Sequence, residues 1–525
     1  MEASKATKEI GVPVAVLVLI WAAWKVVNWL WLRPKKLERL LRKQGLQGTP
    51  YTFLTGDSTK MFNMRKQAKT KPMNLSHDII PRASSFFNHI VNQYGKNPFM
   101  WIGASPRIII TDPVLLKDVM NKIYDFTKPD QNPLFKLLTT GVANYNGDQW
   151  AKHRRIINPA FNVEKLKIML PTFYKSINDM VDKWEKMLSS HGGSCEIDVW
   201  PFLQNVTCDV ISRTAFGSSY EEGKRIFELL KEQARLIVKV FFKLYIPGYR
   251  FLPTSEKKRM KRNDKDIKAS LKGIINKREK AMEAGEASKD DLLGILLESN
   301  HKEIEEHGNS KDDGMSIQDV MEECKIFYFA GQETTSVLLV WTMVLLSRYS
   351  EWQKRAREEV LQVFGNQIPD FNGLNHLKIV TMILYEVLRL YPPVLTLTRA
   401  VPRDMKLGQL TIPKEVLLTL PIGLIQHDRE LWGDDAKEFK PERFSEGVLK
   451  ATKGQLSFFP FGWGPRICIG QNFAMLEAKM AISMILQRFW FELSPTYVHA
   501  PTDEVTLKPQ YGAQIVFHKL LPVSV

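Results

Sequence analysis

Cysteine is scarce in this chain of 525 residues, which contains only Cys195, Cys208, Cys324 and Cys468. No two of them form a C-x-x-C pair, and this argues against a structural zinc site. So few cysteines in so long a chain also argue against a disulfide framework, and they are typical of a reducing compartment.

The chain also lacks internal repeats and a glycine-rich nucleotide-binding motif of the G-x-G-x-x-G type. Without a nucleotide site, any redox chemistry needs electrons from another protein. The hydrophobic content of 44% excludes extended disorder. No linker divides the later part of the chain, so we expect an N-terminal segment at 1–45 and one large domain at 46–525.

Acidic residues are outnumbered, with 57 against 73 basic residues and a formal net charge of +16. Such an excess can attract nucleic acid, an anionic membrane or an acidic protein partner. A nucleic-acid binder should align its basic residues with aromatic residues on one surface. Much of the excess instead follows a long apolar run, at Arg33, Lys35, Lys36, Arg39, Arg42 and Lys43. We therefore expect no nucleic-acid partner.

That apolar run extends from Ile10 to Leu32 and is interrupted only by Lys25 and Asn28. At about 1.5 Å per residue, a helix of this length can cross a hydrocarbon core of ~30 Å. A cleaved signal peptide is the alternative, but its apolar region is shorter, follows basic residues and ends at small residues. We expect a retained single-pass anchor with the rest of the chain in the cytosol, because the basic cluster follows the anchor.

Hydrophobic periodicity predicts a mainly α protein with a small β portion. Strand-like alternation occurs at Phe99–Ile102 and Arg107–Thr111, and helical periodicity dominates from about 113 to 390. A last helix is expected at about 471–490, before strand-like segments near 504–518.

One predicted helix begins after Ser316, a typical N-cap residue, and runs to about Ser350. Its second half is apolar on nearly all faces, so we expect it to be buried. It nevertheless contains the segment Ala330-Gly331-Gln332-Glu333-Thr334-Thr335. Glycine and threonine cost helix propensity, and a buried carboxylate costs more unless it is paired or hydrated. The alternative to a functional site is a core helix that tolerates these polar residues.

Cys468 lies in a glycine-rich loop directly before the last predicted helix, within Phe461-Gly462-Trp463-Gly464-Pro465-Arg466-Ile467-Cys468-Ile469-Gly470. Backbone N–H groups and the positive helix terminus would favour a thiolate there. The glycines would let the backbone approach a flat cofactor, and Arg466 offers a cation for an acidic cofactor group. A buried structural cysteine is the alternative, but it would not require these neighbours.

The pattern Phe-x-x-Gly-x-Arg-x-Cys-x-Gly in this loop resembles the haem-binding motif of cytochromes P-450. The resemblance implies the cytochrome P-450 fold, here preceded by one transmembrane helix. It implies haem b as the cofactor, with Cys468 as the axial ligand of the iron. It also implies that Phe461, Arg466 and Gly470 bind the haem.

The polar segment of the buried helix resembles the oxygen-activation groove of the same family. The resemblance implies that Ala330 borders the haem and, with Gly331, leaves room for dioxygen. It implies that Thr334 and Glu333 are catalytic and deliver protons, with Glu333 passing them from water.

Glu386 and Arg389 stand at i and i+3 on a predicted helix whose other residues are nearly all apolar. An exposed pair would contribute only ~0–1 kcal/mol, whereas buried charges must be paired. The two residues resemble the family's Glu-x-x-Arg helix. The segment Pro441-Glu442-Arg443-Phe444 resembles the one whose arginine completes a buried triad. The resemblance implies a structural role for Glu386, Arg389 and Arg443 beneath the haem.

Trp150 and Arg154 form a Trp-x-x-x-Arg pair on one face of a predicted helix. Three basic neighbours surround the pair, so a solvated basic face is the alternative. The resemblance implies that Trp150, Arg154 and, further along the chain, Arg399 reach the haem propionates.

Several phrases in the chain, among them 151–155, 329–335 and 390–393, resemble the plant clan-72 (72A-like) enzymes of terpenoid metabolism. This implies an NADPH- and O2-dependent monooxygenase that oxidises a C–H bond of a hydrophobic plant metabolite, of triterpenoid, iridoid or gibberellin type. It implies NADPH–cytochrome P-450 reductase as the partner and the endoplasmic-reticulum membrane as the location. A haem-thiolate isomerase or lyase and a non-catalytic haem protein are the alternatives, and neither needs Glu333 and Thr334 as a proton relay.

The same resemblance suggests which side chains meet the substrate. An apolar wall is expected from Phe241, Phe242, Val394 and Leu395. Thr396 and Gln510 are the residues expected to recognise a hydroxyl or carboxylate.

Overall fold

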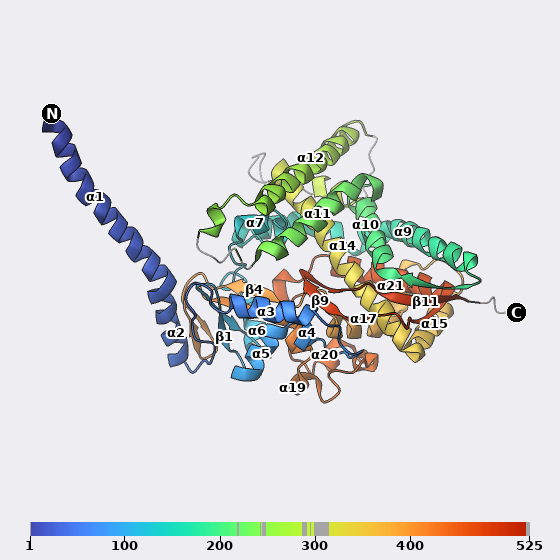
Figure 1. The fold of residues 1–525 in the computed structure, drawn as a ribbon. Helices are drawn as coiled ribbons and strands as arrows, with labels where there is room; N and C mark the ends of the chain where they lie inside the picture. Colours follow the sequence, from blue (N-terminus) through green and yellow to red (C-terminus); the bar gives the residue numbers. More distant parts are fainter. Residues whose placement is uncertain are drawn as a thin grey trace.

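A computed structural model of the protein describes residues 2–217, 220–241, 243, 248–285, 291–294, 296–298 and 314–520. Helices make up most of it and surround a long central helix, α14 (Figure 1). The α-helices are α1 (Glu2–Val27), α2 (Arg33–Lys43), α3 (Ser58–Lys69), α4 (Ile80–Ala83), α5 (Ser85–Tyr94), α6 (Pro113–Asn121), α7 (Pro133–Lys136), α8 (Gly147–Ile157), α9 (Val163–Ser190), α10 (Val199–Phe216), α11 (Tyr220–Val240), α12 (Ser255–Glu283), α14 (Ile317–Arg348), α15 (Ser350–Phe364), α16 (Phe371–His376), α17 (Lys378–Leu390), α18 (Ile422–Gln426), α19 (Arg429–Trp432), α20 (Gly447–Ala451) and α21 (Gln471–Arg488).

Short helices of other types connect these elements. They are the π-helix η1 (Asn28–Leu32) and the 3₁₀-helices η2 (Gly141–Ala143), η3 (Asn158–Phe161), η5 (Tyr249–Phe251), η6 (Pro441–Phe444) and η7 (Gly464–Arg466). The mainly helical class with a small β portion is therefore confirmed.

The strands form small sheets. The largest has the order β1–β2–β7–β4, with β1 (Phe99–Ile102), β2 (Ser105–Ile109), β7 (Leu417–Leu420) and β4 (Leu397–Ala400). A three-stranded sheet has the order β3 (Ser194–Asp198), β11 (Gln514–Lys519), β8 (Phe489–Leu493). Two further sheets are hairpins, one of β9 (Pro501–Glu504) with β10 (Thr506–Pro509) and one of β5 (Met405–Leu407) with β6 (Leu410–Ile412). The predicted strand at Arg107–Thr111 begins two residues earlier, because the chain turns tightly after β1 and pairs Ser105 with Ile102.

The N-terminal helix extends away from the rest of the molecule (Figure 1). Its segment Pro13–Lys43 is apolar and long enough to span a membrane, and only 6% of its most apolar stretch is buried. Tyr51 and Arg42 tie its end to the body, since Tyr51 Oη donates to the Leu30 carbonyl (2.7 Å) and Arg42 to the Gly48 carbonyl (3.0 Å). This segment is a candidate membrane span, as the apolar run predicted.

Helix α14 is also apolar enough to cross a membrane, but 83% of its most apolar window is buried inside the protein. It begins with a capping box, in which Ser316 and Asp319 satisfy each other's backbone N–H groups. The prediction of a buried helix from Ser316 to about Ser350 is therefore confirmed. Its position in the middle of the fold brings residues of many elements against its sides.

Candidate active site

The loop before α21 holds Cys468 in a tight turn. The Cys468 N–H donates to the Phe461 carbonyl (2.8 Å), closing the loop on itself. Gly462 and Gly464 have φ of 75° and 70°, a conformation that favours glycine. A Cβ on Gly464 would lie 2.7 Å from the Asn121 side-chain oxygen, so this loop also needs a residue without a side chain.

A cavity of about 370 Å³ separates this loop from α14. Cys468 lines one side of it, and Ala330, Gly331 and Thr334 line the other. Most of the remaining wall is apolar and includes Val142, Ile211, Phe327, Leu338, Val394 and Leu397. The thiol is thus open to the cavity while the protein encloses the cavity around it. Such a space fits a flat apolar group that contacts the sulfur.

The electrostatic surroundings of Cys468 are mixed. Burial raises the pKa of its thiol, while the Gly470 backbone N–H and the Arg154 guanidinium act in the opposite direction. A coordinated metal ion deprotonates a thiol outright, and iron in the cavity would complete this site.

Four cationic residues line the cavity: Arg154, Lys128, Arg399 and Arg466. Burial lowers the pKa of Arg399 and of Arg466 to about 10. Burial and these two arginines lower the pKa of Lys128 well below its usual value. The Nε atoms of both arginines are buried and have no hydrogen-bond partner among the described residues. No acidic residue lines the described cavity, so the cations fit a ligand that brings its own carboxylates, as haem does.

Trp150 and Arg154 lie on the face of α8 that meets the cysteine loop. Arg154 donates to the Ile467 carbonyl (2.9 Å), and the Arg466 guanidinium lies 4.6 Å from the centre of the Trp150 ring. Trp150 is 8% exposed, so the alternative of a fully solvated basic face is wrong for this pair.

On α14, Thr334 and Glu333 face different spaces. Thr334 Oγ1 donates to the Ala330 carbonyl (2.7 Å) at the cavity. Glu333 does not line that cavity. It is 6% exposed and accepts a hydrogen bond from Thr506 Oγ1 (3.1 Å). It lines a separate cavity of about 190 Å³, whose lining also includes Lys231 and Lys508.

Gly331 of the same segment lets α10 approach α14 closely, because a Cβ there would lie 3.0 Å from Ile211 Cδ1. The room beside Thr334 is therefore bounded by Ile211, a residue that no sequence motif indicated. Close packing and cavity shape are set at the same position.

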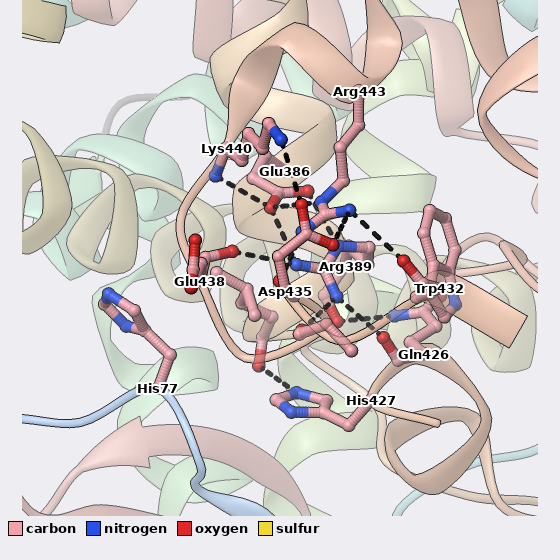
Figure 2. Close-up of polar contacts among 12 residues, drawn as sticks. His77, Glu386, Arg389, Gln426, His427, Trp432, Asp435, Glu438, Lys440 and Arg443 are labelled. Carbon is pink, nitrogen blue, oxygen red and sulfur yellow. Dashed lines mark hydrogen bonds and ion pairs between the residues drawn. The ribbon is translucent and has the colours of Figure 1, made fainter. Parts of the chain in front are cut away.

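Glu386 and Arg389 are both fully buried and form a two-pronged ion pair with both N–O distances at 2.7 Å. Arg389 also donates to the backbone carbonyls of Gln426 (2.9 Å) and Ala436 (2.7 Å) (Figure 2). Arg443 lies 3.4 Å from the same glutamate and pairs with Asp435 at 2.7 Å. The three predicted residues are thus together, and they hold the irregular chain that leads to the cysteine loop.

The expected substrate contacts are only partly met. Val394 lines the cavity, whereas Leu395 packs against Gly423 and is not among the lining residues. Gln510 is occupied by Arg82 (2.7 Å) and the Lys69 carbonyl (3.1 Å). Phe241 packs against Phe135, and Phe242 lies outside the described residues. Thr396 is not among the cavity-lining residues either.

A cysteine thiol in a glycine loop thus faces an apolar cavity whose described lining includes cations and no acidic residue, and this set of residues fits a cysteine-ligated haem. The comparisons with known proteins agree. The family model described as "Cytochrome P450" matches residues 77–517. The chain belongs to the cytochrome P450 family, and it is a P450 monooxygenase of the plant CYP72A type.

Two relatives represent this group. "Cytochrome P450 CYP72A219" of Panax ginseng is 60% identical over 97% of this chain and 98% of its own. "11-oxo-beta-amyrin 30-oxidase" of Glycyrrhiza uralensis is 57% identical over 99% of this chain and 100% of its own. The solved structure "Retinoic acid bound cyanobacterial CYP120A1" has a TM-score of 0.74 and 22% identity, covers 90% of this chain and 99% of its own, and supports the fold.

Proposed function

We propose that this oxidoreductase uses NADPH and O2 to hydroxylate, or further oxidise, a C–H bond of a terpenoid, with triterpenoids as the first class to test. One observation carries the proposal: Cys468 and the α14 residues Ala330, Gly331 and Thr334 line one largely apolar cavity. The high identity to a relative named as an oxidase of an amyrin derivative supports the triterpenoid class.

The proposed haem site uses the residues that line this cavity. Cys468 would supply the thiolate ligand, and Phe461 and Gly470, which line the same cavity, would contact the haem. Lys128, Arg399 and Arg466 would bind the propionates. Trp150 and Arg154 would support this arrangement through their contacts with Arg466 and the Ile467 carbonyl. Haem, when bound, supplies dioxygen activation, and an axial thiolate favours cleavage of the O–O bond.

The protein's own part is to position the substrate and to deliver protons. Ala330 leaves space in the cavity, and the Thr334 hydroxyl lines the same cavity and can carry a proton into it. Glu333, on the side with Lys231 and Lys508, takes protons from solvent. Because Glu333 does not line the cavity, transfer to Thr334 requires a bridging water or rotation of the Glu333 side chain.

The chain is proposed to divide into an anchor with its basic segment at 1–45 and a single catalytic unit at 46–525. The apolar helix and the basic residues after it favour the endoplasmic-reticulum membrane with the catalytic unit in the cytosol. The absence of a G-x-G-x-x-G motif from the sequence favours electron supply by NADPH–cytochrome P-450 reductase.

The substrate proposal is tested with microsomes that contain the chain and a plant reductase. Amyrin-type triterpenes, iridoid glucosides and gibberellins are screened by the spectral change that substrate binding causes, and bound compounds are incubated with NADPH. We expect an oxidised triterpenoid whose formation needs both NADPH and reductase. Product without NADPH would favour an isomerase, and haem without any product from these classes would reject the terpenoid assignment.

Thr334→Ala should uncouple the reaction. Without the hydroxyl, proton delivery to reduced dioxygen is disturbed and electrons leave as hydrogen peroxide. General acid help is typically worth ~10²–10⁴-fold, so we expect product per NADPH to fall on the order of tenfold or more, with haem and substrate binding kept. Product, NADPH and peroxide are measured together. Glu333→Gln should instead lower turnover and NADPH use together.

Thr342→Ala is the matched control for this variant. Thr342 lies on the same helix and its hydroxyl donates to a carbonyl four residues earlier at the same 2.7 Å, but it does not line the cavity. Its loss should leave product per NADPH unchanged. An unchanged ratio in Thr334→Ala as well would remove Thr334 from the proton path.

A further inference from the structure

The buried side chain of Glu323 contacts one wall of the cavity on the side that faces away from the cavity. Val142 and Ala143 line the cavity and belong to η2, in the segment between α7 and α8. Glu323 of α14 is fully buried, and its Oε1 accepts from the Val142 N–H (2.8 Å). The same oxygen lies 2.7 Å from Nδ1 of His153 on α8. Glu323 therefore joins α14, α8 and the cavity wall at one atom.

The Glu323 carboxyl group is closely packed, and its burial costs folding free energy. Gly141 has φ of 78°, and a Cβ on it would lie 2.7 Å from Glu323 Oε2. That oxygen is buried and has no hydrogen-bond partner among the described residues. Burial raises the pKa of Glu323, while His153 and the Val142 N–H act in the opposite direction. A buried, incompletely bonded carboxyl group destabilises a fold, which raises the question of what Glu323 positions.

The same segment also holds the cations of the cavity. The Tyr145 ring packs edge-on against His153, with centroids 4.8 Å apart, and the Tyr145 carbonyl accepts from Arg466 (2.6 Å). Asn146 Oδ1 accepts from Arg466 (3.2 Å) and from the Lys128 N–H (2.8 Å). A shift of this segment would therefore move the apolar wall and two cations together.

We propose that Glu323 is a positioning residue that fixes segment 141–146 and so determines which substrates fit the cavity. Glu323 is not among the residues that line the cavity, and it acts through Val142 and His153. The inference rests on the proposed haem-thiolate function, because segment 141–146, which Glu323 positions, forms part of the wall of the proposed haem cavity.

The test compares two haem ligands in full-length, haem-loaded protein in microsomes. Imidazole is small and reports access to the iron, whereas 4-phenylimidazole also places a ring against the cavity wall. Loss of the hydrogen bonds to the buried Glu323 carboxyl group should weaken binding of 4-phenylimidazole about tenfold relative to imidazole in Glu323→Ala. Gly141→Ala should weaken 4-phenylimidazole binding in the same way, because its methyl group would collide with the Glu323 carboxyl group. Glu323→Gln, which keeps an acceptor for the Val142 N–H, should show a smaller change.

In the double variant Glu323→Ala/Gly141→Ala, the loss of 4-phenylimidazole affinity relative to imidazole should be smaller than the product of the two single losses. The reason is that Glu323→Ala makes room for the added methyl group. Glu359→Gln is the control. Glu359 also accepts backbone N–H groups of another element, at Lys378 (2.6 Å) and Ile379 (2.8 Å), but lies outside the cavity lining. It should leave the ratio of the two affinities unchanged.

An unchanged ratio in both Gly141→Ala and Glu323→Gln would overturn the proposal, even if Glu323→Ala failed to load haem. That combination would leave Glu323 a purely structural role. Failure of the wild-type protein to bind imidazole at a haem would instead reject the proposed function itself. The two failures are therefore distinguishable.

Discussion

Replacement of Cys468 by serine is expected to abolish the strongly red-shifted absorption band of the reduced carbon monoxide adduct. A serine hydroxyl is far less acidic than a thiol and does not donate electron density as a thiolate does. Cys468 is the cysteine that lines the cavity opposite Ala330 and Thr334. We therefore expect complete loss of this band and of product formation, measured by difference spectroscopy and by turnover.

The other cysteines provide the controls. Cys208 and Cys324 are buried, and burial raises the pKa of both thiols, so neither is a ready thiolate. Cys195 lies in β3. Replacing any of the three should leave the band in place. Persistence of the band in Cys468→Ser would show that another group binds the iron.

The cysteine loop could be predicted because its requirements are local. Gly464 is needed for a turn, and Cys468 precedes a helix in the sequence itself. The buried helix was equally readable, since its apolar faces and its Ser316 cap are adjacent in the chain. The same holds for Glu386 and Arg389, whose spacing places them on one helical turn.

Other parts of the site depend on contacts between distant segments. Lys128 belongs to no motif, and its place beside Arg399 and Arg466 follows from how three separate segments fold onto the cavity. Gln510 looked available for a substrate, but the fold gives its side chain to Arg82 and a backbone carbonyl. Periodicity reports which face of an element is buried, and it does not report what that face meets.

Glu333 illustrates the same limit within one motif. It directly precedes Thr334, yet successive residues on a helix point about 100° apart. Thr334 consequently faces the haem cavity while Glu333 faces the space with Lys231 and Lys508. Adjacent positions in the sequence therefore line two different cavities, and the proposed proton path has to connect them.

Glu386→Ala is expected to destabilise the fold severely. Arg389, with no exposed side-chain surface, would keep its backbone acceptors but lose its counter-charge. Breaking a buried ion pair by removing one partner typically costs ~3–5 kcal/mol, because the remaining charge is buried and uncompensated. The Lys440 N–H, which donates to Glu386 (3.0 Å), would lose its acceptor as well. We expect little haem-loaded protein and a lowered temperature of unfolding.

Glu442→Ala tests whether burial is the cause. Glu442 pairs with Arg355 at 2.8 Å, but the two side chains are 46% and 39% exposed. Exposed pairs contribute only ~0–1 kcal/mol, so this variant should load haem normally although it lies beside Arg443. Replacing both Glu386 and Arg389 by leucine should cost less than Glu386→Ala alone, since no unpaired charge remains. Normal haem content and thermal stability in Glu386→Ala would contradict the buried-pair account and leave the cysteine loop to be held by other contacts.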